Sequence, residues 1–386
     1  MDLNINLKKM IIKKDKQLKL GFIGGGINSA IGHIHFSSSQ MDGIWKVESG
    51  IFSENYNISQ KTAKDWNIPR DRVYSNLNNF IKYEKNRLDA VVVILPIPKH
   101  FKVIYQLLKN NIPVISEKTM IANLNEAKTI YKICKKNNSF LNVTYNYSGY
   151  PLIRELKARI KNGELGEIQQ FHFEMPQDSF THNINKKASH QKWRLKDKKI
   201  PTMILDLMAH LYNLCYFLIE KKPKKVFSNF SNFSKFKVID NSFIQMEFEK
   251  KIQGFFWASK VAYGSRNGLK IRIFGSKASA EWNHLNPEEL KISSKNHLYK
   301  IIDRASKKNY IVGHKRYNRF KAGHPSGFME AFANIYVDIA DALRDYKKNK
   351  KYTNFYVFNE LFELNNMQVL TKATQSSKKR NWIKIN

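Results

Sequence analysis

A glycine-rich turn directly after a short apolar run constrains the fold of this chain more than any other feature of its sequence. The run, Leu18 to Ile23, has the continuous apolar character of a buried parallel strand. Gly24-Gly25-Gly26 follows it, and a helix is expected to begin between Ser29 and Gly32. Glycines let the backbone approach a pyrophosphate closely, and a helix N-terminus offers that anion free N–H groups and a positive dipole. This order of elements indicates a dinucleotide-binding Rossmann unit.

The glycine turn is longer than the usual G-x-G-x-x-G spacing, because its last glycine, Gly32, comes three residues late. Within this loop we expect contacts to the cofactor from Gly24, Gly26, Asn28 and Ile31. A glycine cluster alone is weak evidence. Its position directly after the first buried strand is what favours a phosphate-binding loop.

The residue after the second strand bears on the choice between NAD and NADP. That strand is expected at Lys46–Phe52, so Ser53 takes the position that reads the adenosine ribose. An aspartate there would accept a hydrogen bond from the 2′-hydroxyl of NAD, whereas Ser53 neither repels a 2′-phosphate nor supplies a cation for it. Glu54, the next residue, can serve NAD instead. We therefore predict NAD as the cofactor, with NADP possible.

Strands and helices continue to alternate up to residue 146, which predicts a doubly wound parallel sheet. Asp89–Leu95 is the clearest buried strand, and it leads into a loop, Pro96–His100, at the sheet edge where open α/β sheets bind ligands. We expect Pro96 and His100 to contact the cofactor. Further strands are expected at 113–115 and 141–145, and helices at 60–66, 74–80, 101–110 and 124–137.

The pattern changes after Tyr150-Pro151, and residues 147–386 are predicted to form an α+β domain with an open, mainly antiparallel sheet. Its strands are expected at 167–174, 224–228, 241–248, 253–259, 269–274 and 278–282, and its helices at 152–162, 204–219, 328–346 and 356–373. An open sheet has a broad face that needs cover. We therefore expect a homodimer or homotetramer that associates through this sheet.

The net charge of +34, from 66 Lys and Arg against 32 Asp and Glu, allows two interpretations. It could mark a nucleic-acid-binding surface, or the lysines could be scattered over the solvent-facing surface. The lysines come in twos and threes and no DNA- or RNA-binding motif accompanies them, so we expect no specific nucleic-acid partner. No run approaches the roughly 18 apolar residues of a membrane span. Two distant cysteines, Cys134 and Cys215, indicate a reducing cytoplasmic location and no metal site.

Two features of the chain can carry chemistry. The helix expected at 204–219 places Asp206 and His210 four residues apart on one face, so the carboxylate can orient the imidazole and tune it as a general base. A structural pair or a metal site is the alternative. Lys118 follows a Rossmann strand near the expected nicotinamide, where a lysine can stabilise a developing alkoxide. For Lys118 alone, a plain surface lysine is the competing interpretation.

Together these features resemble the glucose-fructose oxidoreductase / inositol dehydrogenase family (Gfo/Idh/MocA oxidoreductases). The resemblance runs from about Leu18 to about Tyr346. Its carriers are Gly24-Gly25-Gly26 with Gly32 and His35, Leu95-Pro96 with His100, Glu117-Lys118, Gly163 to Ile168, Trp193-Arg194, Asp206 with His210, Asn146 to Pro151, and Gly323 to Gly327. It implies a two-domain NAD(P)-dependent dehydrogenase for a sugar, polyol or glycoside. It also implies that Lys118, Asp206 and His210 are catalytic, and that Glu117 lies by the nicotinamide ribose.

The sequence departs from the family pattern at four places: Thr119, Pro201-Thr202, Ile97-Pro98 and Ser53. Proline is usual at the position of Thr119, and the cis X-Pro bond assumed there is not expected before threonine. The catalytic set survives these changes, while cofactor preference is left open. A non-catalytic, dinucleotide-sensing protein of the same fold is therefore the alternative function.

The resulting hypothesis is hydride transfer between nicotinamide and a secondary hydroxyl or ketone. His210 takes the hydroxyl proton, Asp206 orients His210, and Lys118 polarises the oxygen. A narrower version places the oxidation at C3 of a glycoside. The remaining cofactor candidates are Asn146, Trp193 and Arg194, and the remaining substrate candidates are Tyr147, Gln177, Asp178, Trp193 and His324.

Overall fold

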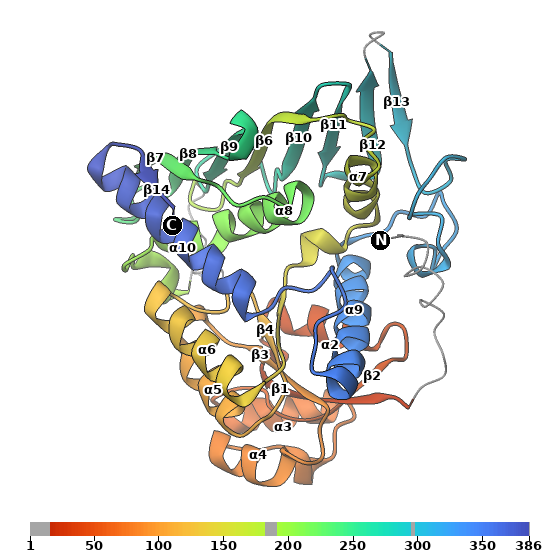
Figure 1. The fold of residues 1–386 in the computed structure, drawn as a ribbon. Coiled ribbons are helices and arrows are strands. Elements are labelled where there is room, and N and C mark those ends of the chain that lie inside the picture. Colours follow the sequence, from red (N-terminus) through yellow and green to blue (C-terminus); the bar gives the residue numbers. More distant parts are fainter. Residues whose placement is uncertain (1–15, 182–190, 295–297, 386) are drawn as a thin grey trace.

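The computed structural model describes residues 16–181, 191–294 and 298–385. It contains two sheets, a five-stranded one built from the first part of the chain and a nine-stranded one built from the second. Figure 1 shows the two sheets one above the other, with helices on both sides of the smaller sheet and between the two. The residues that follow β3, β4 and β5 face this central region.

The smaller sheet is parallel throughout, with strand order β2-β1-β3-β4-β5. All five residues of the central strand β3 are buried, because helices cover both faces of the sheet. This confirms the predicted doubly wound parallel sheet. Its strands are β1 (Leu18–Gly24), β2 (Trp45–Ile51), β3 (Ala90–Ile94), β4 (Val114–Glu117) and β5 (Leu141–Thr144).

The helices of this part are α2 (Gly32–Gln40), α3 (Tyr56–Asp65), α4 (Leu77–Glu84), α5 (Ile97–Lys109) and α6 (Leu124–Asn137). The prediction of a loop over Pro96–His100 was wrong, since α5 already begins at Ile97. Pro98 lies in the first turn of this helix, where the N–H that proline lacks is not needed. Helix α4 begins later than predicted because the side chain of Asn76 caps it.

The larger sheet has the order β13-β12-β11-β10-β6-β9-β8-β7-β14. Its neighbouring strands are antiparallel except for the β6–β9 pair, which confirms the mainly antiparallel sheet expected from the sequence. The strands are β6 (Ile168–Pro176), β7 (Lys225–Ser231), β8 (Asn241–Glu247), β9 (Gln253–Ser259), β10 (Lys270–Gly275), β11 (Ala278–Asn283), β12 (Asn286–Ser294), β13 (Tyr299–Ile302) and β14 (Ile383–Lys384).

Four further helices belong to the second part of the chain: α7 (Pro151–Lys161), α8 (Ala209–Ile219), α9 (Phe328–Asn349) and α10 (Glu360–Lys379). Helix α9 runs beside α2 (Figure 1), and its Tyr336 accepts a hydrogen bond through its carbonyl from Trp45 Nε1 of β2, at 2.9 Å. Helix α10 packs against both α6 and β7. Helix α10 therefore fastens the two sheets together across the central region.

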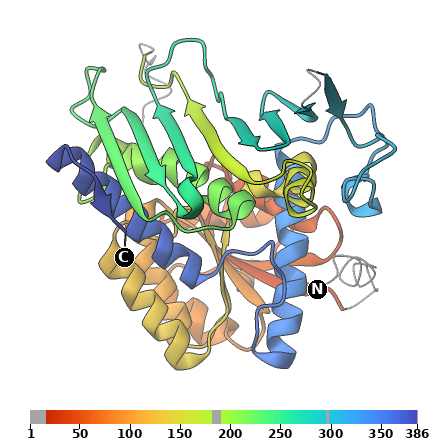
Figure 2. The ribbon, with the colours of Figure 1, turned by 45° about the horizontal axis from the view of Figure 1, so that its top comes forward.

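The larger sheet has one covered and one open face. Helices α7, α8 and α10 lie on the face toward the smaller sheet, and Figure 2 shows no helix among the described residues on the opposite face. The alternation along β8 reflects this, because Ile244 is buried while its neighbour Phe243 is 56% exposed. The open face thus carries exposed aromatic side chains.

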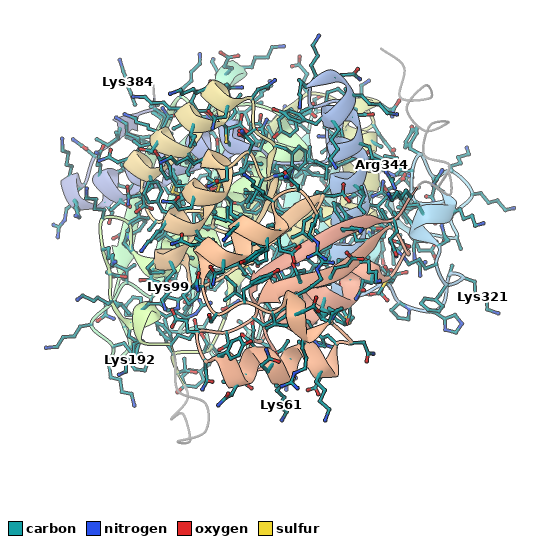
Figure 3. The ribbon with its side chains drawn as sticks, turned by 90° about the horizontal axis from the view of Figure 1, so that it is seen from below. Lys61, Lys99, Lys192, Lys321, Arg344 and Lys384 are labelled. Carbon is teal, nitrogen blue, oxygen red and sulfur yellow. The ribbon has the colours of Figure 1, made fainter. Side chains whose placement is uncertain are left out.

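The excess of positive charge is spread over the molecule. Figure 3 shows Lys61, Lys192, Lys321 and Lys384 projecting from different sides, and these residues belong to separate parts of the fold. Within the described residues, no helix combines the length and the apolar character needed to cross a bilayer.

Candidate functional site

A cavity of about 330 Å³ lies between the two sheets, at the carboxyl ends of β3 and β4. This is the edge where parallel sheets bind ligands. The structure brings eleven of the residues singled out in the sequence to its wall: Ile31, Pro96, Glu117, Lys118, Asn146, Tyr147, Gln177, Trp193, Arg194, Asp206 and His210. They come from both halves of the chain, so the cavity exists only in the assembled fold.

The glycine loop between β1 and α2 is packed too tightly for side chains. Gly24 and Gly25 have φ angles of +84° and +73°, and a Cβ at Gly32 would lie 1.8 Å from the carbonyl oxygen of Gly25. Ala30 and Ile31 follow at the N-terminus of α2 and line the cavity, and their backbone N–H groups have no hydrogen-bond partner among the described residues. Free N–H groups at a helix N-terminus suit the pyrophosphate of a dinucleotide.

Asn146 is a second, independent indication that the cavity binds a ligand. Its side chain is 2% exposed and lines the cavity just after β5, and its amide Nδ2 has no hydrogen-bond partner among the described residues. A buried amide without a partner costs about 1–3 kcal/mol, so it is expected to donate to a bound ligand. The residues present therefore fit a dinucleotide.

Lys118 and Thr119 directly follow β4, and both form hydrogen bonds to residues of the second half of the chain. The Lys118–Thr119 peptide bond is cis, so the expectation of a trans bond before threonine was wrong. That expectation used only the local preference of non-proline residues, whereas Thr119 is fully buried and donates a hydrogen bond from Oγ1 to the carbonyl of Leu205 at 2.6 Å. The Lys118 ammonium donates to the Asp206 backbone carbonyl at 2.9 Å and to its Oδ1 at 3.0 Å.

Asp206 is held by three cations. Besides Lys118, its Oδ2 accepts hydrogen bonds from Arg194 NH1 at 2.5 Å and from Lys260 Nζ at 2.8 Å. Burial alone would raise the pKa of Asp206, but Lys118, Lys260 and Arg194 hold it well below its usual range. Asp206 is therefore ionised at neutral pH and anchors the three cations.

His210 does not pair with Asp206 as the sequence predicted, because both carboxylate oxygens are occupied by the cations. Asp206 lies in a π-helical turn, η4 (Ile204–Met208), which precedes α8 and changes the angular spacing that an α-helix would give. Two tyrosine rings pack edge-on against His210 instead: Tyr147 at 4.7 Å and Tyr145 at 6.1 Å between ring centroids. Burial and the nearby Lys118 charge lower the pKa of His210 well below its usual value, so the imidazole is neutral.

Five predicted site residues besides the glycines lie outside the cavity wall. His100 is fully buried, where its Nε2 lies 2.6 Å from the Leu95 carbonyl oxygen and its Nδ1 3.1 Å from that of Met120. It thus ties the end of β3 to the loop after Lys118. The others are Asn28 and His324, which are exposed, Ser53 and Asp178, which are half-buried, and Gly24 and Gly26, which form the floor of the glycine loop.

Lys260 is the residue that the sequence did not single out. It follows directly after β9, is 4% exposed, and reaches Asp206 from the larger sheet. One lysine among 66 basic residues gives no signal of its own. Its position at the end of a predicted strand was visible, but its partner on a distant helix was not.

Glu117 provides a test of the electrostatics of the site. Burial raises its pKa to about 7, although Lys118 acts in the opposite direction. A carboxyl with a folded-state pKa above its unfolded value of 4.5 binds more protons in the folded state, so stability falls as pH rises between these values. Relative to Glu117→Gln, the wild type should lose up to about 3 kcal/mol of unfolding free energy between pH 4.5 and pH 8.

Urea unfolding at several pH values measures this difference. Glu54→Gln is the matched control, because the side chain of Glu54 is 79% exposed. Parallel stability curves for the wild type and Glu117→Gln over this range would show that Glu117 ionises normally in the folded protein.

A Rossmann domain whose glycine loop, free amides, lysine and neutral histidine all meet at one cavity defines a dinucleotide-dependent oxidoreductase. Residues 18–145 match the model of the oxidoreductase family with an NAD-binding Rossmann fold, and residues 153–281 match the GFO/IDH/MocA C-terminal domain. The chain belongs to this family, which confirms the resemblance found in the sequence, and its cofactor is NAD.

Relatives of known sequence or structure cover nearly the whole chain. The uncharacterized oxidoreductase YfiI of Bacillus subtilis is 27% identical over 344 residues, which cover 85% of this chain and 86% of YfiI. An inositol dehydrogenase homolog from Azotobacter vinelandii, crystallised with NAD+, superposes with a TM-score of 0.89 at 26% identity, over 96% of this chain and 98% of that one. Its complex with NADH and myo-inositol gives a TM-score of 0.87, also at 26% identity, over 95% and 97% of the two chains.

Proposed function

We propose that this protein is an NAD-dependent dehydrogenase that transfers a hydride between the nicotinamide and a secondary hydroxyl or ketone carbon of a sugar, polyol or glycoside. The observation that carries the proposal is the presence of Lys118 and the neutral His210 in the wall of one cavity with the glycine loop. The myo-inositol and NADH bound by the Azotobacter vinelandii homolog support a polyhydroxylated substrate.

Lys118 is positioned to hold the reacting oxygen. An ammonium group has three N–H donors, and Asp206 accepts from two directions, through its backbone carbonyl and Oδ1. The third donor is available to the substrate hydroxyl, where it stabilises negative charge as the oxygen loses its proton. Asp206 keeps the ammonium in place through both contacts.

His210 is the proposed proton acceptor. The described residues offer no hydrogen-bond partner to its ring nitrogens, and the ring is held by packing against Tyr147. A neutral imidazole can accept the hydroxyl proton at once, without first losing its own. NAD, when bound, supplies the carbon that accepts the hydride. Ala30, Ile31, Asn146 and Glu117 are the residues that would hold it.

Polar side chains of the second half of the chain are proposed to hold the other substrate hydroxyls. Asn267 donates to the Tyr147 hydroxyl at 2.9 Å and accepts from Gln177 Nε2 at 3.0 Å, so it fixes two residues of the cavity wall at once. Trp193 offers an apolar face for stacking against a sugar ring. This combination suits a ring that carries several hydroxyl groups.

Formation of NADH on mixing the protein with NAD and a panel of sugars and polyols tests the proposal. The panel should contain myo-inositol, D-glucose and a methyl glucoside, each with NAD and with NADP. We expect reduction of NAD by at least one compound. Binding of NAD without reduction by any compound would favour the alternative function, a dinucleotide-sensing protein.

We also propose that the chain associates with a second copy through the open face of the larger sheet. Phe243 stacks on Trp257 of the neighbouring strand at 6.1 Å between ring centroids, and Phe255 is 40% exposed on the same face. Exposed aromatic side chains on an uncovered sheet are typical of an interface.

Phe243→Lys should therefore shift the protein to the monomer mass, because the substitution places a charge within the proposed interface. Light scattering coupled to size-exclusion chromatography measures the mass. Phe320→Lys is the control, since Phe320 is 62% exposed but belongs to a loop away from this sheet. A wild-type protein that already has the monomer mass would rule out this interface.

A further inference from the structure

Three cationic side chains converge on the one carboxylate of Asp206, and they come from separate parts of the fold. Lys118 follows β4, Arg194 lies in a short helical turn, η3 (Lys192–Leu195), and Lys260 follows β9. All three nitrogen–oxygen distances are 3.0 Å or less. One cation is enough to neutralise one carboxylate, so an anchoring role for Asp206 leaves the other two charges unexplained.

The remaining acid of the cavity wall does not balance these charges. Glu117 is turned toward the Thr144 hydroxyl, which donates to it at 2.9 Å, and toward the Lys118 backbone N–H. Burial also keeps a large share of Glu117 protonated near neutral pH, since it raises the pKa to about 7. A buried excess of charge is costly unless a ligand compensates it.

We propose that the cavity selects an anionic substrate, a sugar or polyol that bears a carboxylate or a phosphate, and that Arg194 binds this anion. The proposal rests on the dehydrogenase function proposed above and names its substrate class. The carboxylate and the phosphate share one property: each carries its negative charge on two or more neighbouring oxygen atoms.

Arg194 is suited to the task because most of its guanidinium is still available. It lines the cavity, its side chain is 31% exposed, and NH1 bonds to Asp206. Its Nε and NH2 have no partner among the described residues. The guanidinium lies over the Trp193 ring, 4.6 Å from its centroid, and this cation–π contact restrains it. A restrained guanidinium with free donors binds carboxylates and phosphates through two parallel hydrogen bonds.

Lys260 acts indirectly, as a positioning residue. It is 4% exposed and does not reach the cavity wall, so it cannot itself bind a substrate. By bonding to Asp206 Oδ2 it supplies the counter-charge for this carboxylate. The charges of Lys118 and Arg194 are thereby left for the ligand. The net charge of +34 of the whole chain further favours the encounter with anions.

Three hexoses that differ only at C6 test the substrate class: D-glucose, D-glucuronate and D-glucose 6-phosphate. We expect kcat/KM with NAD to be at least about tenfold higher for one of the two anions than for glucose, which corresponds to a single added ion pair. The carboxylate and phosphate arms distinguish the two anion types. Equal or better use of glucose would overturn the proposal.

Variants show whether the cation cluster causes the preference. Lys260→Gln and Arg194→Gln should each lower the anion-to-glucose ratio of kcat/KM by about tenfold, and Lys260→Arg should retain it. Lys250→Gln is the control, because Lys250 lies in the turn before β9, its side chain is 74% exposed and it does not line the cavity. Thermal unfolding identifies folded variants. The partly exposed Arg194 provides the test if Lys260→Gln does not fold.

Calorimetric binding of glucuronate, glucose 6-phosphate and inorganic phosphate to the protein with NADH separates this proposal from the dehydrogenase function. If the anions bind, lose affinity in Lys260→Gln, and yet no compound is oxidised, the anion site stands and the dehydrogenase function fails. If glucose is oxidised and the anions bind wild type and Lys260→Gln equally, the dehydrogenase stands and the anion site is overturned. If the anions neither bind nor react, the anion site is likewise overturned.

Discussion

Replacement of Lys118 by methionine is expected to lower kcat by about 10² to 10³-fold, because the variant loses the donor that stabilises the forming alkoxide. The effect should be confined to catalysis. Asp206 keeps two other cations, Arg194 at 2.5 Å and Lys260 at 2.8 Å, so its carboxylate remains ionised and in place without Lys118. The thermal stability and the affinity for NADH of Lys118→Met should therefore stay close to those of the wild type. Steady-state kinetics and NADH fluorescence measure the two effects separately.

Lys102→Met is the control for this experiment, since Lys102 is an exposed residue of α5 in the same half of the chain. Its kcat should equal that of the wild type. A Lys118→Met enzyme that turns over at nearly the wild-type rate would remove Lys118 from the proposed mechanism. A loss of NADH binding in Lys118→Met would instead give Lys118 a role in holding the cofactor.

Periodicity and local motifs were sufficient for the fold class, but they did not predict the strands β12, β13 and β14 of the larger sheet. Continuous apolar runs such as Val91–Ile94 identified the parallel strands, and the change of pattern after Tyr150-Pro151 identified the mainly antiparallel sheet. Local patterns were less reliable at helix starts. The first turn of α5 was missed because proline at its second position was taken as a sign of a loop.

The residues of the cavity wall could be predicted in part. There is a physical reason why some were found and the contacts among them were not. Lys118, Asn146 and Asp206 were found because each stands next to a strand end or in a family motif. The contacts among them depend on side chains from distant elements, which no local pattern encodes. Lys260 lies 54 positions from Asp206 along the chain. The contact between the two residues exists only in the three-dimensional structure, so the sequence alone could not reveal it.

The same limit affected His210. A spacing of four residues predicted a pair with Asp206, but the π-helical turn and the three competing cations broke that pair. Instead, the Tyr147 and Tyr145 rings pack against the imidazole and orient it. The packing of tyrosine rings against a histidine cannot be recognised from residue spacing. The spacing of Asp206 and His210, by contrast, suggested a carboxylate–histidine pair that does not form.

His210→Gln is expected to lower kcat by about 10² to 10⁴-fold, because glutamine can form hydrogen bonds but cannot accept the hydroxyl proton. The pH dependence follows from the direction of the pKa shift. An ordinary histidine base becomes protonated as pH falls through about 6.5, and the rate falls with it. Burial and Lys118 lower the pKa of His210, so the rate of oxidation should not fall at this point.

The pH profile of kcat/KM between pH 5.5 and 8 is best measured in the Glu117→Gln background, which removes the carboxyl of the cavity wall whose pKa burial raises to about 7. His314→Gln serves as the control, because His314 caps a short helical turn outside the cavity wall and should leave kcat unchanged. A profile that falls through pH 6.5 and is abolished by His210→Gln would show that His210 is the base but titrates normally. Wild-type turnover in His210→Gln would show that another group accepts the proton. Tyr147 would then be the first candidate, because its ring packs against His210 in the cavity wall.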